Sequence, residues 1–306
     1  MKTIEFIKSR SVRASIADSW YILALNWKKY LKQNLVPALV AGLSGAFALE
    51  MLLQYLCQHF LPAYRLFQTK ADMNLVKMIL MPSVSELVLI PISLLLVLLF
   101  MAYYKGKVLG NICSYAENNE LTGKIVVGLK GKERTFAVKS VKLQLIFYVL
   151  SFIVCSLIAY AAYRWQIRIL YLLPIVFVYF WTTGNVSYLQ SALGEVGVFA
   201  GLKRGVKKSL GFAFIVQLLT VIPFVLVVMI FLLPAVIYVL SSLSAQDSRL
   251  VGDAAYMPQY LPVLFFVLNT IGLAVILFFD SVRTSALAMR LEILMKKEEP
   301  VEEPVE

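Results

Sequence analysis

The stretch LVLIPISLLLVLLFMAYY at 87–104 decides the fold, because it is long, apolar and free of charged side chains. A helix needs about 20 mainly apolar residues to cross the hydrocarbon core of a bilayer. The strands of a membrane barrel alternate between apolar and polar residues, and this stretch does not. The same criteria predict an all-α, polytopic membrane helix bundle with six transmembrane helices. Their predicted bounds are Leu35–Cys57, Leu87–Tyr104, Leu143–Tyr163, Ile169–Leu189, Phe212–Leu240 and Leu261–Phe279.

The composition of the whole chain also favours a lipid environment. Of its 306 residues, 60% are hydrophobic and 15% are charged, whereas soluble domains have about 45–50% and about 25%. The net charge of +11 would suit a nucleic-acid partner, but the basic residues are dispersed between apolar runs instead of forming one face. We therefore expect no nucleic acid to bind.

Lys and Arg are divided unequally between the segments that connect the predicted spans. Of the 29, 23 lie before the first span, in 105–142, in 190–210 or after Asp280. Because basic loops stay in the cytoplasm, this division predicts that both termini are cytoplasmic. The predicted organisation is a cytoplasmic amphipathic segment (1–33), a transmembrane domain (34–295) and an acidic tail (296–306) with too little apolar content to pack.

Two segments combine an apolar stripe with flanking basic residues. In the first, apolar residues recur every three or four positions between Val12 and Leu31, and in the second Val198, Leu202 and Val206 form the stripe. Such helices lie in the membrane interface with their bases toward anionic headgroups. The predicted lipid contacts are the aromatic and basic side chains Trp20, Trp27, Lys28, Lys29, Lys203, Arg204, Lys207 and Lys208.

The six spans could form three repeated pairs. A further basic stretch at 136–142 precedes the third span, so that each pair follows an amphipathic segment. Gly110-Asn111 and Gly184-Asn185 occupy similar places in the first two pairs, whereas the third pair has no such dipeptide. Internal repetition is therefore one interpretation of the layout.

Glu50 lies inside the first predicted span, where a charged side chain costs about 2.5–3.5 kcal/mol. Ala38, Gly42 and Ala46 precede it at four-residue intervals, which favours close helix packing on the same face. Glu50 is then either protonated or hydrogen-bonded at a helix contact, or it lines a polar cavity that couples to a proton or substrate. Asn269, inside the last span, is a second candidate for such a polar site, or bonds to a neighbouring helix.

Two further patterns suggest contacts near the cytoplasmic interface. Gly197, Gly201 and Gly205 recur at four-residue spacing, which predicts either flexibility or close docking under a transmembrane helix. Asp280 and Arg283 are three residues apart, a spacing that permits an ion pair on one helix face.

No motif for catalysis, a metal or a nucleotide is present in the sequence. Three cysteines without a CxxC pair and a single histidine, His59, cannot make a Cys/His zinc site. The sequence contains no HExxH, GxSxG or phosphate-binding loop. We therefore predict no cofactor, no metal and no enzymatic activity, although an intramembrane enzyme could use dispersed residues.

Basic lead-ins such as GLKRGVKK at 201–208, running into pairs of membrane helices, resemble a group of six-helix bacterial inner-membrane families. One of these is the membrane domain attached to some glycerophosphodiester phosphodiesterases. The resemblance implies an all-α bundle in a bacterial inner membrane. It transfers no catalytic residue, because the soluble phosphodiesterase domain has no counterpart in this chain.

Three functions are compatible with these patterns. The first is an accessory or scaffold component that binds lipids, a membrane protein partner or a second copy of itself. The second is a transporter or channel-like protein for a small solute or lipid, suggested by Glu50 and by Pro223 and Pro234 in the fifth span. The third is an intramembrane enzyme that acts on lipid, for which no acid, base or nucleophile is readable at a suitable spacing.

Overall fold

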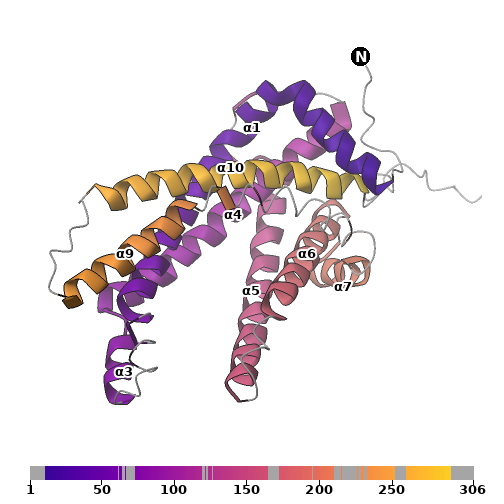
Figure 1. Ribbon diagram of the computed structural model, residues 1–306. Coiled ribbons are helices and arrows are strands. Elements are labelled where there is room, and N and C mark those ends of the chain that lie inside the picture. Colours follow the sequence, from indigo (N-terminus) through magenta and orange to yellow (C-terminus); the bar gives the residue numbers. More distant parts are fainter. Residues whose placement is uncertain are drawn as a thin grey trace, which may run out of the picture. The chain divides into compact units, whose positions relative to one another are not determined.

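The computed structural model describes residues 11–60, 73–118, 127–164, 172–194, 196–209, 233–251 and 260–290, with isolated residues between these ranges. Within them every regular element is a helix and none is a strand. The all-α class that the apolar runs predict is therefore confirmed. The helices are α1 (Val12–Tyr55), the π-helical turn η1 (Leu56–Phe60), α3 (Met73–Leu80), α4 (Val84–Asn118), α5 (Lys132–Arg164), α6 (Leu172–Leu193), α7 (Val198–Ser209), α9 (Leu233–Val251) and α10 (Leu261–Arg290) (Figure 1).

Three of these helical segments are long and apolar enough to cross a membrane: Arg13–Phe60, Val84–Asn118 and Leu261–Met289. They contain the first, second and sixth predicted spans. A shorter apolar helix covers Leu233–Ser244. Most of the fifth predicted span lies outside the described residues, so six spans and the three repeated pairs remain predictions.

The chain forms two compact units. Unit 1 contains Met1–Asn34, Ala102–Pro223 and Phe279–Glu306, and unit 2 contains Leu35–Met101 and Phe224–Phe278. The division within α1 falls directly after Asn34, beside the boundary that the sequence predicts at 33/34. The helix itself does not end there, and its non-helical residue is Asn26, whose side-chain amide donates to the Ile22 carbonyl.

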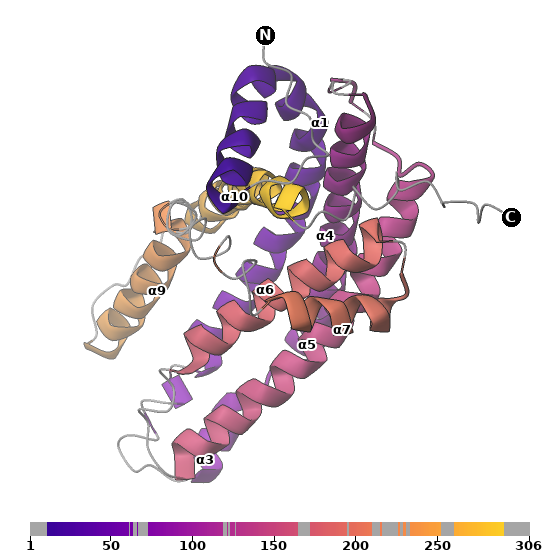
Figure 2. The same cartoon turned by 90° about the vertical axis from the view of Figure 1, so that its right-hand side faces the viewer.

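In unit 1, α6 lies beside α5 and α7 lies against α6 (Figures 1 and 2). Glycines on α4 allow a further close approach, to the first turn of α5. A Cβ atom on Gly106 would lie 2.8 Å from the Glu133 carbonyl oxygen, and one on Gly110 would lie 2.6 Å from the Glu133 Cγ. The Gly110-Asn111 dipeptide thus has a packing role in this unit.

In unit 2, α1 and α10 pack through the small residues that precede Glu50. A Cβ atom on Gly42 would lie 2.9 Å from the Thr270 carbonyl oxygen, and Ala38 and Ala46 are both buried. Such small faces let two helix backbones approach closely.

The start of α4 in unit 2 carries a capping box. The Glu86 amide donates to Ser83 Oγ at 3.2 Å, and the Ser83 amide donates to Glu86 Oε2 at 2.8 Å. Each side chain thereby pairs a backbone donor that the helix leaves unsatisfied. The helix that contains the apolar run at 87–104 therefore begins at a fixed residue.

Candidate functional site

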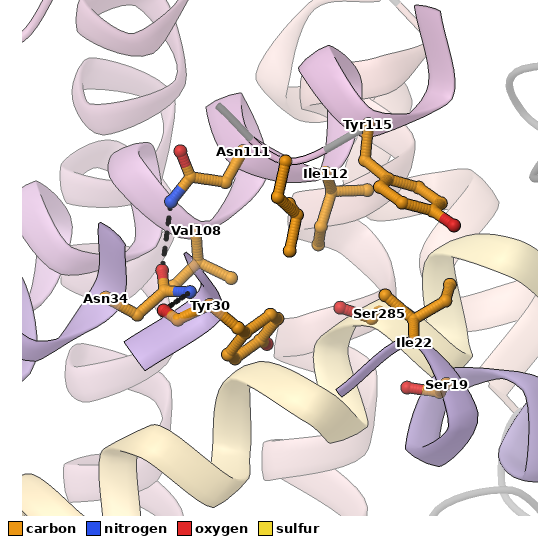
Figure 3. Close-up of a pocket in the computed structure, with 10 residues that line it drawn as sticks. Ser19, Ile22, Tyr30, Asn34, Val108, Asn111, Ile112, Tyr115 and Ser285 are labelled. Carbon is orange, nitrogen blue, oxygen red and sulfur yellow. Dashed lines mark hydrogen bonds between the residues drawn. The ribbon is translucent and has the colours of Figure 1, made fainter. Parts of the chain in front are cut away.

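A buried polar network links three helices of unit 1. The Tyr30 hydroxyl and Ser281 Oγ are 2.6 Å apart, and the Asn34 side-chain amide donates to the Tyr30 carbonyl at 3.2 Å. The Asn111 amide in turn donates to Asn34 Oδ1 at 3.0 Å. Figure 3 shows Asn34 between the other two residues that it joins. Tyr30 and Asn34 are buried, so the network specifies how α1 and α4 meet.

A small cavity borders this network (Figure 3). Its polar lining comes from the side chains Ser19, Tyr30, Asn34, Asn111, Tyr115 and Ser285. Ser19 already donates to the Val282 carbonyl at 2.6 Å, and Ser285 to the Ser281 carbonyl at 3.0 Å. The remaining wall is largely apolar, with Val108, Ile112 and Leu121 among its residues. This cavity therefore offers little unused hydrogen-bonding capacity, and its polar groups hold the helices together.

Asp280 and Arg283 form the ion pair that their spacing permits. The pair is buried within unit 1, with Arg283 only 4% exposed. The Thr284 hydroxyl donates to the Asp280 carbonyl on the same helix. A buried pair must be well satisfied to offset the loss of hydration of both charges. These two residues therefore have a packing role inside unit 1.

A second ion pair, between the buried Lys107 and the half-buried Glu133, was not apparent from the sequence. Lys107 Nζ lies 2.7 Å from Glu133 Oε2 and also donates to the Gly128 carbonyl, and Lys107 is 2% exposed. Glu133 also accepts from the Lys130 amide at the start of α5. A carboxylate is favourable at a helix N-terminus. In the sequence, this ion pair is indicated by the four-residue spacing of Gly106 and Gly110. Two glycines on one face of α4 leave room for Glu133.

Glu50 and Asn269, the two candidates for an intramembrane polar site, both belong to unit 2 and are buried. Glu50 Oε1 accepts a hydrogen bond of 3.3 Å from the Gln54 side chain, one turn further along α1. Asn269 Oδ1 has no hydrogen-bond partner within the described part of the chain. No hydrogen bond between the two residues is present there either. Glu50 therefore has a local partner, whereas Asn269 retains an unused acceptor.

The predicted lipid contacts on α1 are exposed. Trp20 is 41% exposed and Trp27 is 54% exposed. The Lys28 ammonium lies 5.7 Å from the centre of the Trp27 ring, a cation–π contact. Lys28 and Lys29 are both exposed. These residues form an aromatic and basic surface of the kind found at membrane interfaces.

The glycines of α7 hold this helix against α6. A Cβ atom on Gly201 would lie 2.6 Å from Ser191 Cβ, and one on Gly205 would lie 2.0 Å from Ser187 Oγ. A Cβ atom on Gly197, which precedes the helix, would meet nothing within 4 Å. Close docking therefore accounts for Gly201 and Gly205, and Gly197 takes no part in the contact.

Lys139 of α5 supports the same arrangement. Its ammonium donates to the Ser191 carbonyl at 2.7 Å and to the Val196 carbonyl at 3.3 Å. A lysine in this place satisfies carbonyls that the end of α6 leaves unpaired. With α7 fixed in this way, the basic side chains Lys203, Arg204 and Lys207 are exposed; the side chain of Lys208 lies outside the described residues.

No protein-family model, curated protein or solved structure matches this chain. A function must therefore be argued from the site itself. Among the described residues, no group of three or more His, Cys, Asp and Glu side chains could hold a metal ion.

Proposed function

We propose that this protein is a non-enzymatic, multi-pass component of a bacterial inner membrane that binds lipids or a membrane protein partner as an accessory or scaffold subunit. The observation that carries the proposal is the basic surface of α7, formed by Lys203, Arg204 and Lys207. A helix that is docked through glycines and leaves its bases exposed presents a fixed positive surface. Anionic headgroups or an acidic partner segment would complement this surface.

The use of the buried polar groups supports binding over chemistry. Asp280 is paired with Arg283, and Lys107 is paired with Glu133. Catalysis needs an acid, base or nucleophile that is free to reach a substrate. Groups that are already engaged in ion pairs are poorly suited to that role, so the exposed surfaces are the stronger candidates for function.

The test is native mass spectrometry, with cross-linking, on the tagged protein purified in nanodiscs. We expect a retained anionic lipid or a stoichiometric partner, and the combined Lys203→Gln, Arg204→Gln and Lys207→Gln variant should lose it. The matched control is the combined Lys124→Gln, Lys130→Gln and Arg134→Gln variant, because these three basic residues are exposed elsewhere. Equal retention by the α7 variant and the wild-type protein would refute a binding role for α7.

The alternative is a transporter or channel-like protein, which the unused acceptor of Asn269 favours. A buried amide oxygen without a partner is costly unless a ligand or water satisfies it. Flux of solutes or lipids into proteoliposomes tests this alternative. We would then expect Asn269→Leu to abolish the flux, and Glu50→Gln to impair it at unchanged expression if proton coupling occurs. No flux across a broad panel would eliminate the alternative.

A further inference from the structure

In unit 2, the single histidine of the sequence lies where the end of α1 meets the start of α4. This residue, His59, belongs to η1, which packs against α3 and α9. Its Nε2 lies 3.0 Å from Glu86 Oε2 in the first turn of α4, and its Nδ1 lies 2.8 Å from the Ile79 carbonyl oxygen of α3. One imidazole ring therefore joins three helical elements.

Both oxygens that face the ring accept hydrogen bonds. A backbone carbonyl has no proton to donate, so Nδ1 must carry one. Glu86 Oε2 already accepts from the Ser83 amide at 2.8 Å and from the Ser83 hydroxyl at 2.7 Å. An oxygen that accepts from two other donors belongs to a carboxylate, so Nε2 must carry a proton as well. The geometry therefore requires the imidazolium form of His59.

The other titratable groups of the surrounding elements leave Glu86 as the charged partner of the ring. From α1, Tyr55 stacks on the imidazole with 5.3 Å between the ring centres. From α3, Lys77 is exposed. Among the described side chains of α9 the titratable one is Tyr238, and phenols are neutral below about pH 10. Within the described part of the chain, no second ion pair involves His59.

We infer that His59 is a pH-sensitive switch, which joins η1 to α3 and to the start of α4 while both ring nitrogens are protonated and releases the start of α4 as the pH rises. Histidine ordinarily changes its charge between about pH 5 and about pH 8. The neutral ring keeps one proton, so one nitrogen would turn a lone pair toward the Glu86 carboxylate or the Ile79 carbonyl. The contact therefore contributes stability at low pH and loses it as the proton leaves.

The switch acts on the start of α4 more than on α3. The Tyr55 hydroxyl donates to the Leu80 carbonyl at 3.0 Å, and a phenol keeps its proton throughout this pH range. This bond continues to tie α3 to α1 when the imidazole is neutral. In the predicted orientation the segment 58–86 is on the outer side of the membrane, so the switch would respond to the pH outside the cell. It does not depend on the binding role proposed for α7.

The inference is tested with His59→Phe and Glu86→Gln. His59→Phe keeps an aromatic ring beside Tyr55 and removes both donors. Glu86→Gln removes the negative charge and keeps the capping box of α4, in which glutamine also serves. This variant therefore keeps the experiment interpretable if His59→Phe does not fold. Lys77→Gln is the control, because it removes an exposed charge from α3.

Each protein is placed in nanodiscs of phosphatidylcholine and compared at about pH 5 and about pH 8. Two quantities are measured: the unfolding temperature, and the hydrogen exchange of the backbone amides at 83–90, corrected for the intrinsic exchange rate. In the wild-type protein and Lys77→Gln, raising the pH should lower the unfolding temperature by about 2–4 °C more than in the two switch variants. It should also speed exchange at 83–90 in the first two proteins alone.

A pH response that both switch variants lose, in either measurement, supports the inference. If His59→Phe does not fold, Glu86→Gln decides alone. A pH response that either folded switch variant retains in full would overturn the inference, because neither the imidazolium nor its ion pair would then be the cause.

Discussion

At the scale of single residues, glycine positions decide how closely the helices of this protein approach each other. Two glycines of α7 face serines of α6 at distances that leave no room for a side chain, whereas a third glycine with the same spacing faces open space. Equal spacing in the sequence therefore does not mean an equal role. The difference can be measured, because Gly→Ala adds the same atom at each position.

We predict that Gly205→Ala and Gly201→Ala each destabilise the protein by about 1–3 kcal/mol, because the added Cβ would overlap atoms of α6 that belong to or adjoin the backbone. Gly197→Ala is the control and should leave stability unchanged. Thermal unfolding in detergent compares the three. If Gly197→Ala lowers the stability as much as Gly205→Ala does, the docking of α7 on α6 is not the reason for these glycines.

The buried Asp280–Arg283 pair gives the second prediction. Arg283→Met leaves the Asp280 carboxylate buried without its partner, which should cost about 3–5 kcal/mol. The double variant Asp280→Leu, Arg283→Met removes both charges and should be more stable than Arg283→Met alone. The free energies of unfolding of Asp280→Leu, Arg283→Met and the double variant, compared with that of the wild-type protein, form a double-mutant cycle. If the effects of the single variants simply add, the two charges do not interact.

At the scale of elements, the sequence predicted the type of structure better than its contacts. Long apolar runs can be satisfied in lipid only as helices, since every backbone group must bond within the segment. The polar network was missed because Tyr30, Asn34 and Asn111 come from two helices far apart in the chain, and no local spacing brings them together. The small face of α1 was readable, because Ala38, Gly42 and Ala46 lie on one helix face by geometry alone.

The α1–α10 contact in unit 2 provides the third prediction. A Cβ atom on Gly42 would meet the Thr270 carbonyl at 2.9 Å and the Ala274 nitrogen at 3.0 Å, and both belong to the backbone. One on Gly45 would meet only Leu273 Cδ1, at 3.1 Å, which is the end of a flexible side chain. Gly42→Ala should therefore lower the unfolding temperature clearly and Gly45→Ala only slightly. The reverse order would mean that the close approach is not at Gly42.

At the scale of the whole molecule, the described helices and the charge distribution address different questions. The helices show which segments can cross a membrane, and three are long and apolar enough. The charge distribution predicts which side each connection faces, because 23 of the 29 basic residues lie in the segments assigned to one side. Length and hydropathy cannot give the partner or ligand, since these depend on which side chains the packed structure leaves exposed, as it does Lys203, Arg204 and Lys207 of α7.

The last prediction concerns the two chain ends. If the chain crosses the membrane six times, both ends share one side, whereas an odd number of crossings puts them on opposite sides. We expect both ends and the 105–142 connection to be cytoplasmic, because most of the Lys and Arg residues lie in the segments assigned to that side. The native Cys57, Cys113 and Cys155 are first replaced by alanine, and single cysteines are then placed in each segment. A membrane-impermeant maleimide should label none of them in intact spheroplasts and all of them after permeabilisation.

A cysteine in 58–86 should label without permeabilisation and is the positive control. Labelling of one end alone in intact cells would refute an even number of spans, and with it the six-helix topology.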